Sequence, residues 1–424
     1  MRNIVFIVFF FTVLWLNLSC NTQHKKMNRE NITAAELLGN PAYPAISYGG
    51  YRQKSRDIQP TINELKNDMK ILAAMGIKLI RTYNLQLEQA PNILKAIDEL
   101  QQENASFEMY VMLGAWIDCA NAWTDHPDHR YEDEENNRSE IQKAVELANE
   151  YPGIVKIIAV GNEAMVHWAW SYYVSPAVVL KYVTQLQNLK KEGKLGKDVW
   201  ITSSDNFASW GGGDTAYHNE DLVDLIKAVD YISVHTYPFH DTHYNPGFWE
   251  VTQRNSENKS QLELIDAAMK RSRDYAIAQF TSVKDYVTSL GVSKPIHIGE
   301  TGWATVSSGY YGRNGSHAAD EYKQALYHKY MRQWTAENNI SCFYFEAFDE
   351  KWKDATNNKG SENHFGLFTV DGKAKFALWE LVDTGAFVGL TRNGNLIEKT
   401  YKGSKENLFI SVLPPIILES EINE

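Results

Sequence analysis

The chain has 424 residues, of which 44% are hydrophobic and 12% aromatic, enough apolar material to bury a large core and to exclude the disordered, collagen-like and coiled-coil classes. Its 42 basic and 53 acidic residues give a formal net charge of -11, which argues against a nucleic-acid partner because phosphate contacts need clustered Lys and Arg. Three cysteines cannot frame a fold of this size, and no cysteine or histidine cluster has zinc-ligand spacing.

The N-terminal segment has the pattern of an export signal. Arg2 precedes an apolar stretch over 4–16, which is shorter than the roughly 20 residues of a membrane span. The sequence LNLSC that ends at Cys20 resembles a bacterial lipobox, in which the cysteine is lipidated and begins the mature chain. We therefore expect a signal peptide over 1–19, a lipid-anchored tether over 20–43, and attachment to the bacterial outer membrane, on its periplasmic or cell-surface side, through that lipid only. An ordinary secreted protein with an incidental cysteine is the alternative.

Over residues 44–384, short apolar runs alternate with segments of helical periodicity, which predicts repeated βα units around a parallel sheet. Strands are expected at 45–48, 78–81, 109–113, 155–160, 199–202, 231–234, 295–298 and 342–345. These runs are short and mostly apolar, as in strands that are buried on both faces. Eight such strands predict an α/β fold of the (β/α)8 TIM-barrel type. A doubly wound sheet is the alternative, but it normally carries a glycine-rich phosphate turn that is absent here.

Helices are expected between these strands. Thr61 and Glu64 form a capping box at the start of the first helix, and Gly76 ends it. Further helices are expected over 90–103, 137–151, 177–192, 260–290 and 318–338. Residues 385–424 lose the helical periodicity and include the apolar run 408–413, so we expect a short β-rich appendage there.

Two glutamates follow predicted strands. Glu163 comes after the fourth and Glu300 after the seventh, and in a barrel the chemistry lies at the carboxyl ends of the strands. Because these strands lie nearly opposite each other, both side chains can reach one cleft. Paired carboxylates suit glycosidic bond cleavage, with retention at a separation of ~5 Å and inversion at ~6.5–9.5 Å. A salt-bridged structural role for either glutamate is the alternative.

Four motifs, in this order along the chain, resemble those of glycoside hydrolase family 17, the β-1,3-glucanase family of the retaining (β/α)8 clan. They are the segments 80–84, 160–163, 299–303 and 345–353. The resemblance covers most of 44–380 and implies that Glu163 is the general acid/base and Glu300 the nucleophile. It also implies that Glu350 and Lys353, in the last motif, position the substrate and balance charge. No cofactor is implied. Beyond Trp303 this chain has Ala-Thr-Val where the family often has Pro-Ser, so endo or exo action stays open.

Several polar and aromatic residues at the strand ends are candidates for contact with a sugar. Arg81 and Tyr237 are expected to support an ionised Glu300, with a rim salt bridge and a core tyrosine as the alternatives. Asn162 is expected to hydrogen-bond the sugar 2-hydroxyl. Tyr83 belongs to the second-strand motif. Tryptophans at predicted strand ends are expected to stack on pyranose rings, and they are Trp116, Trp123, Trp168, Trp170, Trp210, Trp303 and Trp352.

The histidines of the predicted loops do not have zinc-protease spacing, and no metal site is expected. They are His126, His129, His235, His240 and His243. The sequence therefore predicts an exported retaining glycosidase that cleaves β-1,3-glucan polysaccharide or oligosaccharide of the laminarin type, acting as a monomer. A β-1,3-glucan transglycosylase with the same two glutamates and a non-catalytic surface glycan-binding lipoprotein are the alternatives.

Overall fold

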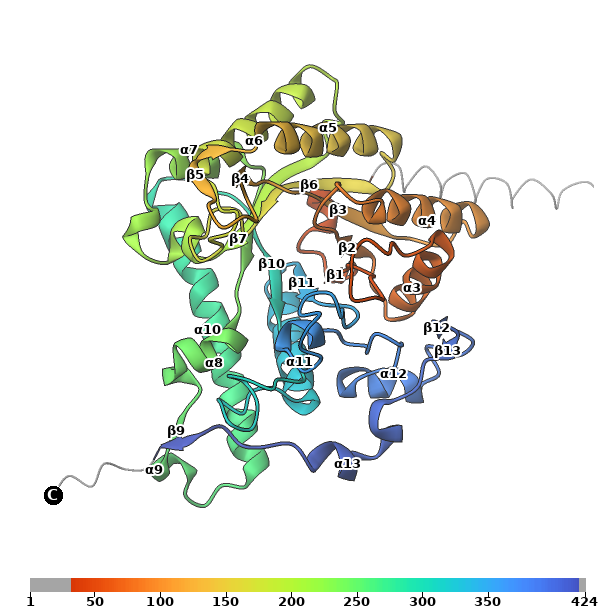
Figure 1. Cartoon of the computed structure of the whole chain (residues 1–424), viewed down its shortest axis with the longest axis vertical. Helices are drawn as coiled ribbons and strands as arrows, with labels where there is room; N and C mark the ends of the chain where they lie inside the picture. The colour runs from red at the N-terminus through yellow and green to blue at the C-terminus, as the bar shows by residue number, and fades with distance from the viewer. Residues whose placement is uncertain (1–31, 419–424) are drawn as a thin grey trace, which may run out of the picture.

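Eight parallel strands close into a barrel, in the spatial order β1-β11-β10-β8-β7-β6-β3-β2 (Figure 1). The computed structural model describes residues 32–418, so the expected signal peptide and Cys20 lie outside the described residues. The barrel strands are β1 (Ala45–Ser47), β2 (Leu79–Arg81), β3 (Tyr110–Ala115), β6 (Val155–Asn162), β7 (Trp200–Asn206), β8 (Ile232–His235), β10 (Ile296–Gly302) and β11 (Cys342–Phe345). Each overlaps one predicted strand, and the (β/α)8 prediction is confirmed.

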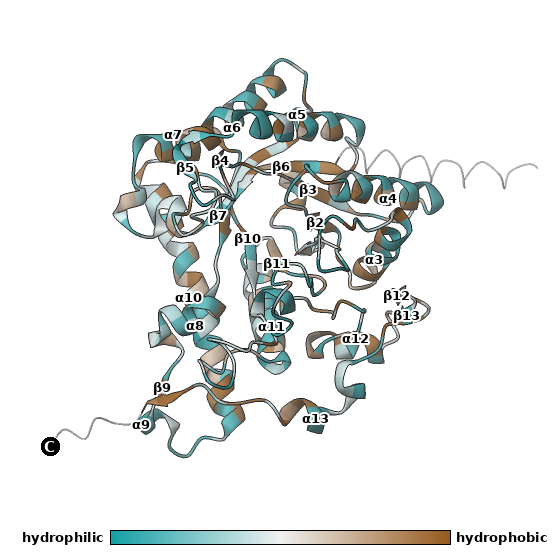
Figure 2. Cartoon of the chain, in the orientation of Figure 1, coloured by the Kyte–Doolittle hydropathy of each residue, from teal (hydrophilic) through white to brown (hydrophobic). Residues whose placement is uncertain are grey.

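The helices lie outside the barrel (Figure 1). The longer ones are α3 (Ile62–Ala74), α4 (Gln89–Glu103), α5 (Glu134–Glu150), α6 (Pro176–Lys191), α7 (Glu220–Ala228), α10 (Gln261–Ser289) and α11 (Glu321–Glu337). The predicted capping box of Thr61 and Glu64 is present at α3. In Figure 2 these helices alternate between teal and brown, as expected for helices with one polar and one apolar face. None of the described helices is long and apolar enough to cross a bilayer.

Short elements extend the loops at the carboxyl ends of the strands. An antiparallel pair, β4 (Cys119–Ala120) and β5 (Asp128–Glu132), lies between β3 and α5. Helix α8 (Pro238–Tyr244), strand β9 (Val251–Thr252) and helix α9 (Gln253–Ser256) lie between β8 and α10. Helices α7 and α8 were not predicted, although Leu222, Leu225 and Ile226 of α7 have helical spacing.

The amino-terminal end of the barrel is closed by helix α2 (Ala34–Leu37). Its buried residues Ala34 and Leu37 pack in one apolar cluster with barrel residues that include Leu79, Tyr110 and Phe343. The structure therefore differs from the expected tether over 20–43, because its last part is an apolar plug rather than a solvated linker.

The C-terminal segment runs along the outside of the barrel. It contains α12 (Trp379–Asp383), β12 (Thr391–Arg392), β13 (Asn395–Leu396), α13 (Lys405–Phe409) and β14 (Ile417–Leu418). Strand β14 pairs with β9, and the two lie side by side in Figure 1. Arg392 is buried and binds the Asp68 carboxylate of α3, so the segment is part of the barrel's packing. No strand forms over 408–413, because helix α13, which Ser404 caps, includes the first two residues of that apolar run.

Candidate active site

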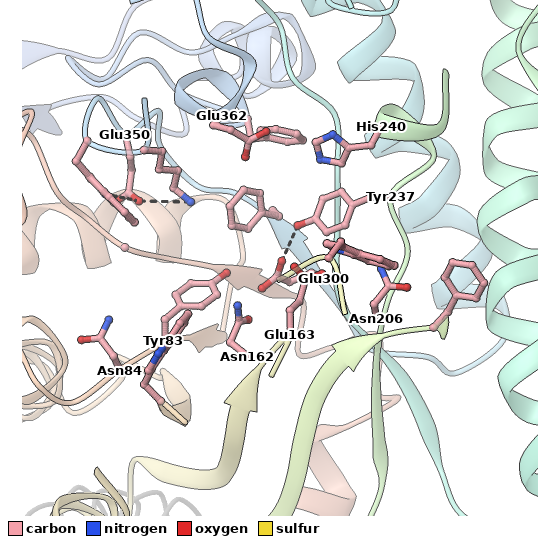
Figure 3. A pocket seen from close by; sticks show the side chains of 18 of the residues that line it. Tyr83, Asn84, Asn162, Glu163, Asn206, Tyr237, His240, Glu300, Glu350 and Glu362 are labelled. Atoms are coloured by element: carbon pink, nitrogen blue, oxygen red, sulfur yellow. Dashed lines mark hydrogen bonds and ion pairs between the residues drawn. The ribbon is translucent and has the colours of Figure 1, made fainter. Parts of the chain in front are cut away.

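A cavity of about 950 Å³ opens at the carboxyl ends of the strands, and Glu163 and Glu300 both line it (Figure 3). Glu163 directly follows β6, whereas Glu300 lies within β10. The register of both strands shifts just before the glutamate. Residue 299 must be glycine because a Cβ there would lie 2.1 Å from the hydroxyl of Ser233. Glu163 itself has a φ of 47°, a left-handed conformation that turns its side chain into the cavity.

His235, at the end of β8, joins the two carboxylates. Its Nδ1 lies 3.2 Å from Oε1 of Glu163 and 3.8 Å from Oε2 of Glu300. The sum of these distances places the two oxygens at most 7.0 Å apart. The Nε2 atom of His235 faces Nη1 of Arg81 at 3.2 Å and the hydroxyl of Ser204 at 2.8 Å. Because a guanidinium can only donate, Nε2 accepts, and the imidazole carries its proton on Nδ1, directed at Glu163.

Glu300 is held by a cation and a phenol. Arg81 Nη1 lies 2.5 Å from its Oε1, and the Tyr237 hydroxyl donates to its Oε2 at 2.6 Å. Burial raises the pKa of the Glu300 carboxyl, but the attraction of His235 and Arg81, the Tyr237 hydrogen bond and the charge of Lys353 outweigh it, and the pKa lies below its usual value of 4.5. The carboxyl is therefore ionised at neutral pH. The prediction that Arg81 and Tyr237 would contact Glu300 agrees with this geometry.

Asn162 extends the same network. Its Oδ1 accepts a hydrogen bond from Arg81 Nη2 at 2.6 Å, which leaves its amide nitrogen to donate into the cavity that it lines. Tyr83 lines the cavity as well, and its ring lies 4.8 Å from the guanidinium of Arg81. Arg81 does not line the cavity and is almost fully buried, so it acts through Glu300 and Asn162 rather than on a sugar.

The eighth barrel strand contributes a second charged group. Glu350 accepts hydrogen bonds from the backbone N–H of Tyr51 at 3.0 Å and from Nε1 of Trp352 at 3.0 Å. Lys353 lies 3.5 Å from Glu346 and 3.8 Å from Glu350, between the two carboxyls. Burial raises the pKa of Glu346 well above its usual value, and the like charge of Glu350 adds to this in spite of Lys353.

The tryptophans divide into two groups. Those that line the cavity are Trp116, Trp123, Trp168 and Trp352. Trp303 was expected to bind substrate, and this is wrong: its side chain is 0% exposed and its indole N–H donates to the carbonyl of Ala318. It follows Glu300 on the outward face of the strand, where it packs on Tyr327 of α11. Trp210 is likewise buried, and Trp170 is exposed but does not line the cavity.

The sequence patterns did not identify His235 and Glu346 as residues of this site, nor other polar residues that line the cavity, such as Asn206 and Glu362. His235 was considered only as a metal ligand, yet it ends a predicted apolar strand, the same signal that located the two glutamates. Among residues 32–418, no group of three His, Cys, Asp or Glu side chains is placed to hold a metal ion.

Residues 45–366 match the family described as BtgE/BtgC glycoside hydrolase domain. The crystal structure of an endo-laminarinase from Formosa Hel1_33_131 is 65% identical and superposes with a TM-score of 0.90, over 93% of this chain and 100% of that one. The Aspergillus niger protein that carries the name glucan endo-1,3-beta-glucosidase btgC is 25% identical over 346 residues, which are 79% of this chain. The chain spans only 42% of that relative's length. A glycoside hydrolase family 17 β-1,3-glucanosyltransferase from Rhizomucor miehei, at 20% identity, covers 79% of this chain and 96% of its own with a TM-score of 0.54, and shows the fold alone.

Proposed function

The chain belongs to the BtgE/BtgC glycoside hydrolase family, and we propose that it is a retaining β-1,3-glucanase of the family 17 type that hydrolyses laminarin-like glucan. The observation that carries the proposal is the convergence of Glu163 and Glu300 on one nitrogen of His235 inside the cavity. Their separation of at most 7.0 Å includes the ~5–5.5 Å of retaining enzymes and excludes most of the ~6.5–9.5 Å range of inverting ones.

The surroundings of the two carboxyls assign their roles. Glu300 is paired with the Arg81 guanidinium and stays ionised, as a nucleophile must. Among the described residues, Glu163 has no Lys or Arg partner within ion-pair distance and faces only His235. Glu163 is therefore the carboxyl without a cationic partner, and we assign it the role of general acid/base opposite the nucleophile.

The reaction then has two steps. An oxygen of Glu300 attacks the anomeric carbon, the glycosidic C–O bond breaks, and the proton of Glu163 passes to the leaving oxygen. In the second step Glu163 takes a proton from water, the resulting hydroxide bonds to the anomeric carbon, and the bond to Glu300 breaks. Tyr237 and Arg81 hold Glu300 in place for both steps, and the amide nitrogen of Asn162 donates to the sugar 2-hydroxyl.

The choice of β-1,3-glucan rests on the 65% identity to the Formosa endo-laminarinase, which aligns over that protein's whole length and also favours endo action. The cavity is consistent with a polymer, because it combines four tryptophans with polar side chains such as Asn84 and Gln86. We infer that Glu350 and Lys353, which both line the cavity, bind sugar hydroxyls.

Incubation with laminarin and with cellulose, followed by a reducing-end assay, tests the substrate. The anomer released first, read by proton NMR, tests retention. We expect activity on laminarin, a β-configured first product, and a loss of roughly 10²–10⁴-fold in Glu163→Gln. Glu300→Gln should be inactive, and azide should restore turnover to Glu163→Ala by replacing the water. Unchanged activity of Glu300→Gln would contradict the mechanism, and products longer than the substrate would favour glucosyl transfer.

We further propose that the protein is exported and anchored to the bacterial outer membrane through a lipid on Cys20. The lipobox-like sequence LNLSC supports this. Growth with a radiolabelled fatty acid should label the wild-type protein and not the Cys20→Ser variant, and only the wild type should sediment with outer membranes. Equal labelling of the two proteins would refute the anchor. Sedimentation velocity of the anchor-free protein tests whether it is a monomer.

A further inference from the structure

Two indoles that line the cavity pack against a tyrosine ring beside the end of β6. Trp123 and Tyr172 are stacked with centroids 4.8 Å apart and an interplanar angle of 21°, and Trp116 lies 5.0 Å from Tyr172. Trp116 and Trp123 line the cavity, and Trp123 is 61% exposed. The Tyr172 hydroxyl donates to the backbone oxygen of Asn162 at 3.4 Å, next to Glu163. This tryptophan platform (Trp116, Trp123 and Tyr172) therefore adjoins the catalytic strand end.

One buried carboxylate holds both indoles of the platform. Oδ1 of Asp118 accepts from Nε1 of Trp116 at 2.6 Å, and its Oδ2 accepts from Nε1 of Trp123 at 3.3 Å. Asp118 is only 5% exposed, and no basic side chain of residues 32–418 forms an ion pair with it. Burial raises the pKa of this carboxyl to about 6 in spite of the two indole hydrogen bonds. A buried carboxylate without a cation destabilises a fold, and such groups persist where function needs them.

Helix α5 fixes the backbone on which the carboxylate stands. The Asn137 side chain accepts from the N–H of Asp118 at 2.8 Å and donates to its carbonyl at 2.9 Å. Glu140 accepts from the N–H of Trp116 at 2.7 Å. Trp123 lies between β4 and β5 with a φ of 64°, and its exposed ring is oriented by Asp118 and Tyr172. An indole that served packing alone would be buried, whereas this one is presented to the cavity.

We propose that the tryptophan platform is a distal subsite that stacks on a β-linked glucose unit beyond the sugar bound at Glu300, and that Asp118 is its positioning residue. The proposal rests on the proposed glucanase function and adds to it a determinant of chain length. A β-linked pyranose ring presents a flat face of C–H groups to an indole, while its hydroxyls remain available to polar neighbours. A glucan chain that extends past the sugar bound at Glu300 would contact the platform, and we expect laminaritriose to be too short to use it fully.

Kinetics on laminarin and on laminaritriose test the platform. Trp123→Ala should raise KM for laminarin about tenfold or more, with kcat unchanged and laminaritriose kinetics changed less than twofold. Trp170→Ala is the matched control, because Trp170 is 54% exposed yet lies outside the cavity lining, and it should leave both substrates unaffected. Asp118→Ala should reproduce the Trp123→Ala phenotype, and Asp118→Asn, which keeps an acceptor oxygen, should recover part of the affinity.

The double variant Asp118→Ala/Trp123→Ala should be no worse than Trp123→Ala alone, since Asp118 acts through the indole. Additive losses, or equal losses on laminarin and laminaritriose, would overturn the proposal. Affinity electrophoresis in laminarin gels separates the glucanase proposal from the platform proposal. If the wild type cleaves neither glucan but is retarded by laminarin more than Trp123→Ala is, the glucanase fails and the platform stands. If the wild type cleaves laminarin and Trp123→Ala is retarded and turns over equally, the platform fails alone.

Discussion

Replacing Arg81 by Met should move the acid limb of the pH–rate profile. Arg81 and Glu300 are paired at 2.5 Å with side chains 1% and 6% exposed, so little solvent screens them. An opposite charge at such a distance lowers a carboxyl pKa by about 1–3 units. Without it, the burial that already raises the pKa of Glu300 is opposed only by His235, Tyr237 and Lys353.

The acid limb should move to higher pH, because the nucleophile must be ionised to react. Glu300 must be ionised, so the wild-type acid limb lies below pH 4.5, and Arg81→Met should shift it upward by about 1–3 pH units. At pH 5 this corresponds to a loss of roughly two- to a hundredfold in kcat/KM, part of which returns as the pH rises to 7. The assay is kcat/KM on laminarin from pH 3 to pH 9.

Arg81→Lys is the matched control. It keeps the positive charge but loses the second arm that reaches Asn162, so we expect a lower kcat with the acid limb nearly in place. Breaking the buried pair should also lower the free energy of unfolding of Arg81→Met by about 3–5 kcal/mol, measured by urea denaturation. An unchanged acid limb in a destabilised but folded Arg81→Met would mean that the arginine serves the fold and not the nucleophile.

Three further variants separate stability from catalysis. Trp303→Phe removes a buried indole and its hydrogen bond, so we expect about 2–3 kcal/mol lower stability in urea with KM unchanged, and a large rise in KM would contradict the buried position. Asp68→Asn leaves Arg392 buried without its carboxylate, so calorimetry should register about 3–5 kcal/mol less stability at constant kcat. Burial raises the folded-state pKa of Glu140 from 4.5 to about 7, so stability that is present below pH 4.5 is lost as the pH rises through 7, by at most roughly 3 kcal/mol. Urea titrations from pH 4 to pH 8 should give a flatter curve for Glu140→Gln, and equal slopes would refute this.

The barrel could be predicted from the sequence because strands that are buried on both faces are short apolar runs wherever they occur. Residues 155–160 and 342–345 are examples, and each lies inside an observed strand. The same rule gave the wrong result at 408–413, where the first residues of the apolar run lie in helix α13, which Ser404 caps. Short apolar runs do not distinguish a strand from a helix, and here the cap decided the outcome.

The candidate site could be located from its position at the strand ends, but that position does not predict which way each side chain points. Glu300 lies in β10 and Trp303 directly follows that strand, yet Glu300 points into the cavity and Trp303 packs against Tyr327 of α11. The register of β10 against β8 shifts between Ile298 and Glu300, where the hydroxyl of Ser233 on the neighbouring strand leaves no room for a Cβ at Gly299. Such a constraint between two strands has no signature in either segment alone.

The two glutamates differ in the charged groups that surround them. Glu163 and Glu300 follow similar sequences, Val-Gly-Asn-Glu and Ile-Gly-Glu, and neither segment contains the group that distinguishes them. The distinction comes from Arg81, contributed by β2, which reaches across the barrel interior to Glu300 and leaves Glu163 facing only His235. The closed barrel makes this possible, because only a closed sheet brings β2, β6, β8 and β10 around one axis so that a guanidinium on one strand can set the charge of a carboxylate on another.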